Sequence, residues 1–247
     1  MELRLRKPRL WLLSDLHVDN PNCDVDALVS DLSAAKREGA QILLGGDIFD
    51  LMQLRHDPRR SYGGIRKEHV ANDYIDAVLR DAVALLRPYR RHIAGVIAGN
   101  HELAALRHAA TDVVRRLCEE IGAEPLPFRG WIRIVAGGKR YAMYYAHGAG
   151  GHHAPVTRGV IDVSRQLVYA NADILWNAHT HSAYVLPYVR EGADGAKLGY
   201  AIRTPSYLRS SATGSDYAAL KGHAPNPVGC AVVSFGSRLS VELRVRV

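Results

Sequence analysis

The chain has 247 residues, with 32 Lys and Arg against 25 Asp and Glu, so it carries a formal charge of +7 before any of its 12 histidines is protonated. A composition of 47% hydrophobic and 23% charged residues argues against a disordered, collagen-like or fibrous chain. The apolar runs fall far short of the roughly 18 residues that a membrane span requires. The 3 cysteines are scattered, which fits neither a disulfide framework nor a cysteine-based zinc site.

Short apolar runs alternate with longer amphipathic segments in the first half of the chain, which is the pattern of βα units. Asp24 has the character of a helix N-cap, and Gly39 and Gly122 follow segments that look helical. In chain order, we expect a strand over 10–14, a helix over 24–38, a strand over 41–45, a helix over 67–86, a strand over 93–98 and a helix over 102–121.

The second half of the chain is richer in strands. Gly137-Gly138 separates two apolar runs, which is typical of a β-hairpin. The segments expected here are hairpin strands over 131–135 and 140–146, a helix over 160–169, and strands over 173–177, 184–189, 198–203, 228–235 and 239–245. No linker-like segment or internal repeat divides the sequence, so we expect one α/β domain over residues 1–247.

Two segments have loop composition. Residues 52–66 are basic and contain Pro58 and Gly63-Gly64, and residues 148–159 are glycine-rich with paired histidines. Long loops in compact domains often carry function, so both segments are candidate specificity elements.

Polar side chains follow each predicted strand of the first half, and the same holds for two later strands. Ligands in open α/β sheets bind at the carboxyl ends of the strands, so we expect these groups to converge. In chain order they are Asp15 and His17, Asp47 and Asp50, Asn100 with His101 and Glu102, His147, and His179 with His181.

A set of Asp, Asn and His side chains without Cys suits Mn, Fe, Zn or Ni. Seven ligands from this set would be more than the four that one tetrahedral ion requires, and a carboxylate can bridge two ions. We therefore expect two divalent metal ions, with Mn favoured.

The order of these motifs resembles that of the calcineurin-like metallophosphoesterase superfamily. DLH at 15–17, GDIFD at 46–50, GNHE at 99–102, AHG at 146–148 and NAHTH at 177–181 follow the sequence of motifs in that family. Ala178 stands where the family usually has Gly, which we expect to alter a turn without removing a ligand. The resemblance implies a four-layer α/β sandwich of two mixed β-sheets flanked by helices, with the metal site at the carboxyl ends of the strands.

The resemblance also implies roles for the polar residues. It implies two ligand sets joined by one bridging carboxylate: Asp15, His17 and His181 for one ion, Asn100, His147 and His179 for the other, and Asp47 for both. A hydroxide between the ions would attack phosphorus, and His101 would protonate the leaving oxygen. Asp50 would orient the His101 ring. Glu102 is expected to serve the first turn of its helix.

The substrate is less clearly indicated. Leu51 occupies the position of a phosphate-binding Arg in the protein phosphatase branch, so the chain looks closer to bacterial and phage phosphoesterases. We expect an anionic phosphoester, with nucleotides or nucleic acids favoured, and no membrane partner; the oligomeric state is not predicted. The candidate substrate contacts are Arg59, Arg60, Tyr62, His152 and Arg158, although the first three also fit a solvated basic loop.

Two further expectations concern location and the main alternative function. The basic N-terminal segment lacks a signal-peptide pattern, so we expect a cytoplasmic protein. The alternative function is a catalytically silent binding module with the same fold. Such a module should have gaps in its ligand set or lack the general acid. In this sequence all the expected ligands and the expected general acid, His101, are present.

Overall fold

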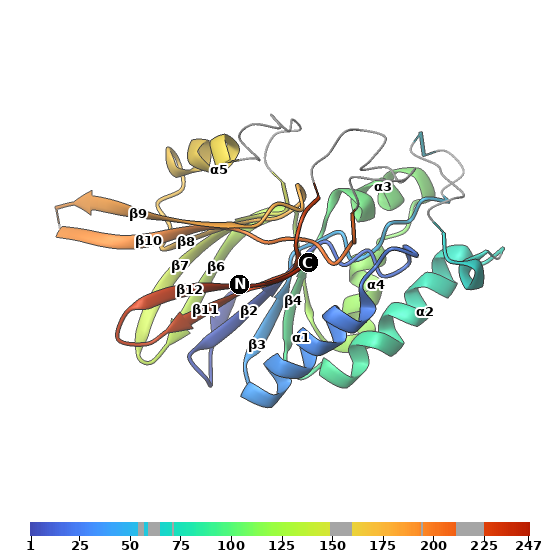
Figure 1. The fold of residues 1–247 in the computed structure, drawn as a ribbon, viewed down its shortest axis with the longest axis horizontal. Coiled ribbons are helices and arrows are strands. Elements are labelled where there is room, and N and C mark those ends of the chain that lie inside the picture. The colour runs from blue at the N-terminus through green and yellow to red at the C-terminus, as the bar shows by residue number, and fades with distance from the viewer. Residues whose placement is uncertain (54–56, 59–64, 71, 149–159, 194, 211–224) are drawn as a thin grey trace.

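The computed structural model describes residues 1–53, 57–58, 65–70, 72–148, 160–193, 195–210 and 225–247. Two mixed sheets of six strands each lie face to face, and helices cover their outer faces (Figure 1). This is the four-layer α/β sandwich that the order of motifs predicts.

The first sheet holds the parallel strands that lead to the first three motifs. Its order is β12-β11-β2-β3-β4-β5, where β2 to β5 run parallel and β11 is antiparallel to both of its neighbours. The strands are β2 (Arg9–Leu13), β3 (Gln41–Leu44), β4 (Ile93–Ile97), β5 (Glu124–Leu126), β11 (Val228–Phe235) and β12 (Leu239–Arg246).

The second sheet carries the two later motifs. Its order is β1-β6-β7-β8-β10-β9; β7, β8 and β10 are parallel, while the β6–β7 and β9–β10 pairs are antiparallel. The strands are β1 (Glu2–Arg4), β6 (Arg129–Ala136), β7 (Lys139–Ala146), β8 (Ile174–Asn177), β9 (Tyr184–Gly192) and β10 (Gly195–Arg203).

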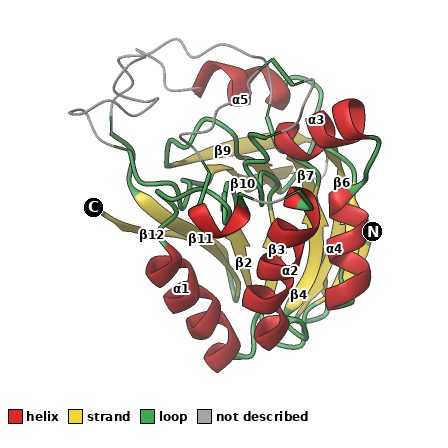
Figure 2. Ribbon diagram, turned by 90° about the vertical axis from the view of Figure 1, so that its right-hand side faces the viewer, coloured by secondary structure: helices red, strands yellow, loops and turns green. Residues whose placement is uncertain are grey.

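Three apolar layers hold the sandwich together. Helices α1 (Val25–Glu38), α2 (Tyr74–Leu86) and α4 (Val113–Ile121) pack on the outer face of the first sheet (Figure 2). Helix α5 (Val160–Leu167) packs on the second sheet, and Leu12, Trp176 and Phe235 are among the residues that fill the space between the sheets. Among the helices of the described ranges, none has the length and apolarity needed to cross a bilayer.

Two of the predicted helices differ from the structure. The helix expected over 102–121 is two helices, α3 (Asn100–Ala109) and α4, because Ala110 is left-handed and the Asp112 carboxylate caps α4 by accepting a hydrogen bond from Arg115 N (2.9 Å). The helix expected over 67–86 begins only at Tyr74, after a short 3₁₀ turn over Lys67–His69; Asn72 and Asp73 favour a helix start over a helix interior. A second 3₁₀ turn, Arg87–Tyr89, follows α2.

Two short strands were not predicted. β1 and β5 have three residues each, too few to show a period of two, and β5 contains Pro125. Both lie at an edge of their sheet, where a missing N–H donor is tolerated. All the strands that were predicted are present, and their ends differ from the prediction by a few residues.

Candidate metal centre

The turns that follow the strands hold their polar residues in an unusual backbone conformation. Asp15, His17, Asp47, His179 and His181 all have positive φ, between 47° and 72°. Residues other than glycine rarely adopt this region, and such strained positions cluster at functional sites. The turns support one another, because Asp15 N donates to Gly46 O (2.9 Å) and His179 N donates to the Asp15 carboxylate (3.2 Å).

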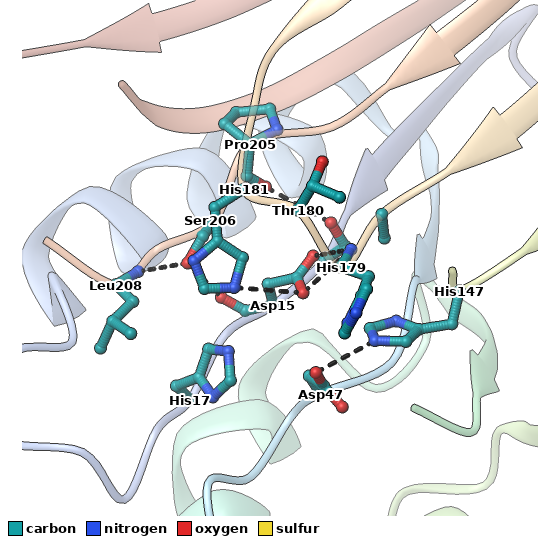
Figure 3. A network of polar contacts seen from close by, with 12 residues as sticks. Asp15, His17, Asp47, His147, His179, Thr180, His181, Pro205, Ser206 and Leu208 are labelled. Carbon is teal, nitrogen blue, oxygen red and sulfur yellow. Dashed lines mark hydrogen bonds and ion pairs between the residues drawn. The ribbon is translucent and has the colours of Figure 1, made fainter. Parts of the chain in front are cut away.

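The first group of donors consists of Asp15, His17 and His181, whose candidate ligand atoms lie within 4.8 Å of one another. His181 Nε2 is 3.5 Å from Asp15 Oδ1, and Asp15 is fully buried (Figure 3). The buried His17 ring has the Asp50 carboxylate 3.2 Å from Nδ1, whereas its Nε2 has no hydrogen-bond partner among the described residues. Buried polar atoms without a partner are unfavourable, so this imidazole fits a metal ion as its missing partner.

The second group consists of Asp47, His147 and His179, again within 4.8 Å. His147 Nε2 lies 3.0 Å from Asp47 Oδ2 and 3.1 Å from Asn100 Oδ1, which brings Asn100 into the group. His147 Nδ1 lies 2.7 Å from Gly45 O, a contact in which Nδ1–H donates and the Nε2 lone pair stays available. A backbone carbonyl that fixes the tautomer in this way is the usual support of a metal-binding histidine.

Gly46 is required for this packing. Its φ is +88°, and a Cβ at this position would lie 2.6 Å from His147 Nδ1. A side chain here would therefore push His147 away from Asp47.

The electrostatics of the metal-free site pair carboxylates with protonated imidazoles. Burial opposes ionisation of Asp47, but His147 and His101 hold its pKa well below the ordinary value. Burial also opposes protonation of the histidines, yet Asp47 raises the pKa of His147 to about 10 and Asp50 raises that of His17 to about 9. Burial and the nearby His147 lower the pKa of His179 to about 4.

Metal binding at pH 7 is therefore expected to release about two protons, because His17 and His147 must lose theirs before they can ligate. Calorimetric titration of the metal-free protein with Mn²⁺, repeated in buffers of different ionisation enthalpy, measures this number. A titration that releases no protons at pH 7 would contradict the expectation.

The same raised pKa values of His17 and His147 also make the stability of the metal-free protein depend on pH. Their contribution is fully present below about pH 6.5 and is lost as the pH rises through about 9 to 10.

His101 lies beside both groups and is held from two sides. Its Nδ1 is 2.6 Å from the backbone carbonyl of Asp50 and 3.5 Å from the Asp50 carboxylate, while Nε2 is 3.8 Å from Asp47 Oδ2. Asp50 Oδ1 also lies 3.2 Å from His17 Nδ1. The nearest contact of Asp50 with His101 is thus through the backbone, and its carboxylate lies near both histidines.

Residues that the sequence analysis left without a site role complete the support of these turns. The buried Glu102 carboxylate accepts hydrogen bonds from Gly99 N (2.8 Å), as expected for the first helical turn, and also from the amides of Asp47, Ile48 and Phe49 (2.7 to 3.1 Å). The sequence feature that could have pointed to Glu102 as a site residue was its position directly after His101.

Arg203 is the second such residue. It is 1% exposed, and its Nη1 donates to Ala178 O (3.2 Å) and Thr180 Oγ1 (2.7 Å), on either side of His179. An arginine at the end of an apolar strand was the signal here, but the sequence does not show which way such a side chain points.

The predicted substrate contacts are not placed. Arg59, Arg60, Tyr62, His152 and Arg158 lie outside the described residues. Of the basic loop at 52–66, Arg66 is described, and its Nε donates to Asn20 O (3.2 Å), three residues after His17.

The comparisons with known proteins give structural similarity only. No protein-family model matches the chain, and no curated protein matches it in sequence. Similar solved structures include a metallophosphoesterase from Sphaerobacter thermophilus (13% identity, 98% of this chain and 90% of the other, TM-score 0.42) and zinc-bound Vps29 from Entamoeba histolytica (11%, 96% and 98%, 0.40). A predicted phosphoesterase from Streptococcus pneumoniae is another (13%, 96% and 98%, 0.38). At these values the similarities carry no argument about activity, which has to come from the site residues.

Proposed function

We propose that this protein is a metal-dependent phosphoesterase of the calcineurin-like type that hydrolyses phosphodiester or phosphomonoester bonds in the cytoplasm. The observation that carries the proposal is the meeting of two groups of buried and partly buried Asp and His donors beside His101. Three buried cysteines without a disulfide suit a reducing compartment.

Two divalent ions fit the donor set, with Mn favoured and Fe, Zn or Ni as alternatives. The proposed ligands are Asp15, His17 and His181 for one ion, Asn100, His147 and His179 for the other, and Asp47 for both. Ions held there would lower the pKa of water and neutralise charge on a phosphoryl group.

His101 is the proposed general acid. Its Nδ1–H donates to Asp50 O, which leaves Nε2 to carry the proton that the leaving oxygen receives. The Asp50 carboxylate, 3.5 Å from Nδ1, lies on the same side of the ring and helps to orient it. The side chain of His101 is 16% exposed, so a substrate can reach it.

The proposal is tested by assaying the Mn-loaded protein on a panel of phosphate monoesters, cyclic nucleotides, nucleoside polyphosphates and DNA, with p-nitrophenyl phosphate and bis-p-nitrophenyl phosphate as reporters. We expect turnover of at least one ester, and its loss in His101→Ala for substrates with a poor leaving group. Metal binding without any turnover would support the alternative, a silent binding module.

A surface next to the site favours a nucleic-acid substrate. Arg129, Trp131 and Arg133 alternate along β6, so their side chains share one face of the second sheet, and all three are exposed. The Trp131 ring is 48% exposed and stacks edge-on against Tyr144 (5.1 Å between centroids). Arg129 pairs with Ala146, the residue before His147. Cations interleaved with an exposed aromatic ring suit a single strand, whose phosphates and bases they would contact in turn.

Trp131→Ala is expected to weaken the binding of single-stranded DNA about tenfold, because a base loses its stacking partner. Fluorescence polarisation with a labelled oligonucleotide measures this, and turnover of bis-p-nitrophenyl phosphate should not change. Leu198→Ala is the matched control, since Leu198 is a comparably exposed apolar side chain on β10 (47%). Equal effects of the two substitutions would remove the support for a nucleic-acid substrate.

A further inference from the structure

Asp19 is a buried carboxylate that the proposed chemistry leaves without a role. It is 1% exposed and lies two residues after His17. Its Oδ1 accepts a hydrogen bond from Asp50 N (2.6 Å), and its Oδ2 accepts from Leu51 N (2.9 Å) and from the Tyr74 hydroxyl (3.1 Å). Both oxygens of Asp19 are thus used to hold two consecutive amides at the end of the GDIFD motif.

One of these amides belongs to the peptide unit that contacts His101. The Asp50 carbonyl and the Leu51 N–H are part of a single planar trans peptide, so they point in opposite directions. Asp19 fixes the N–H side at 2.9 Å, and the carbonyl on the other side lies 2.6 Å from His101 Nδ1. The direction of the carbonyl is therefore set by Asp19.

The peptide needs this support because its backbone is strained. Leu51 has a φ of +51°, a region that is unfavourable for a residue with a side chain. Asn20, the residue after Asp19, donates from Nδ2 to Asp50 Oδ2. Asp19 and Asn20 together hold the backbone and the side chain of Asp50.

We propose that Asp19 is a positioning residue for His101, acting through the Asp50–Leu51 peptide. The inference rests on the proposed function, in which His101 donates a proton to the leaving oxygen. Without Asp19 the peptide can rotate, and His101 then loses the acceptor that orients its ring. The loss of this orientation should therefore slow the hydrolysis only of substrates whose leaving group needs a proton.

The test compares two nucleotide diesters that differ in the leaving group, p-nitrophenolate in one and an alkoxide in the other. Asp19→Asn keeps the shape but replaces one acceptor oxygen by an amide donor. We expect kcat on the alkoxide ester to fall about 10- to 100-fold, as for partial loss of general acid catalysis, with little change on the p-nitrophenyl ester. His101→Ala should show the same selectivity, and the double variant should be no slower than His101→Ala.

The control is Asp112→Asn at the N-cap of α4, a carboxylate that also accepts a backbone hydrogen bond, from Arg115 N, but whose side chain is 44% exposed. Its effect should be equal on both esters. If the wild-type protein hydrolyses no member of the substrate panel, the proposed function fails; if it hydrolyses only monoesters, the comparison is made with a p-nitrophenyl and an alkyl monoester. If the wild-type protein is active and Asp19→Asn slows both esters equally or neither, the positioning role is overturned.

A measurement on the wild-type protein keeps the proposal testable even if Asp19→Asn does not fold. The Leu51 amide proton, held by a buried carboxylate, should exchange slowly with solvent and resonate downfield in an NMR spectrum. The His101 Nδ1 proton, identified by its loss in His101→Ala, should be visible for the same reason. Fast exchange of the Leu51 amide would overturn the proposal.

Discussion

Asp47→Asn is expected to lower kcat/KM on a phosphodiester by about a thousandfold or more, because charge stabilisation at the reacting group depends on it. Asp47 Oδ2 lies 3.0 Å from His147 Nε2, and its Oδ1 accepts a hydrogen bond from His101 N (3.0 Å). An amide at this position removes a negative charge from the donor set and directs an NH₂ group at one of these neighbours. Steady-state kinetics, together with a metal count by mass spectrometry, measure the effect.

Asp173→Asn is the control for this prediction. Asp173 precedes β8 at the end away from His179, and its carboxylate accepts a hydrogen bond from Ala142 N (2.7 Å) and pairs with Arg190. We expect this variant to keep the metal count and the activity of the wild-type protein. Wild-type activity in Asp47→Asn would contradict both the ligand assignment and the proposed mechanism.

The sequence was sufficient to predict which side chains meet at the site. Asp15 and Asp47 follow neighbouring parallel strands of the first sheet, which end at one edge, whereas His147 follows β7 of the second sheet and joins the site through the order of motifs. The convergence of their side chains therefore follows from the hydrophobic pattern and the order of motifs. The roles of these residues as ligands remain a proposal.

The supporting contacts could not be predicted, because they join side chains to backbone amides far away in the chain. Asp19 contacts the amide of Asp50, and Glu102 contacts those of Asp47 to Phe49. Such contacts depend on how the turns fold, including the positive φ of Asp47 and Leu51. Hydrophobic periodicity carries no information about that conformation.

The errors in the predicted helices have a related origin. The apolar spacing continues across the break at Ala110, so periodicity alone indicated one helix over 102–121. Asp is favoured at N-caps, but the prediction followed the apolar spacing and did not use Asp112 as a helix start. A single capping residue in a sequence therefore does not show whether a segment forms one helix or two.

Glu102→Gln is expected to lower the free energy of unfolding by about 3 kcal/mol, since each buried amide left without an acceptor is unfavourable by about 1–3 kcal/mol. The side chain is 3% exposed. Its Oε2 accepts from Asp47 N (3.1 Å) and Gly99 N (2.8 Å), and its Oε1 accepts from Ile48 N (2.7 Å) and Phe49 N (3.1 Å). A glutamine keeps one oxygen, so its NH₂ group must face two N–H donors.

The effect of Glu102→Gln should extend to metal binding, because the amides of Asp47 and Gly99 flank the proposed bridging carboxylate and the start of α3. Urea unfolding and Mn²⁺ titration of the same preparation measure both effects. Glu120→Gln is the control: its side chain is 56% exposed and pairs with Arg87, so the stability change should stay within about 0.5 kcal/mol. If both variants unfold at the same urea concentration and bind Mn²⁺ equally, Glu102 does not hold the Asp47 turn.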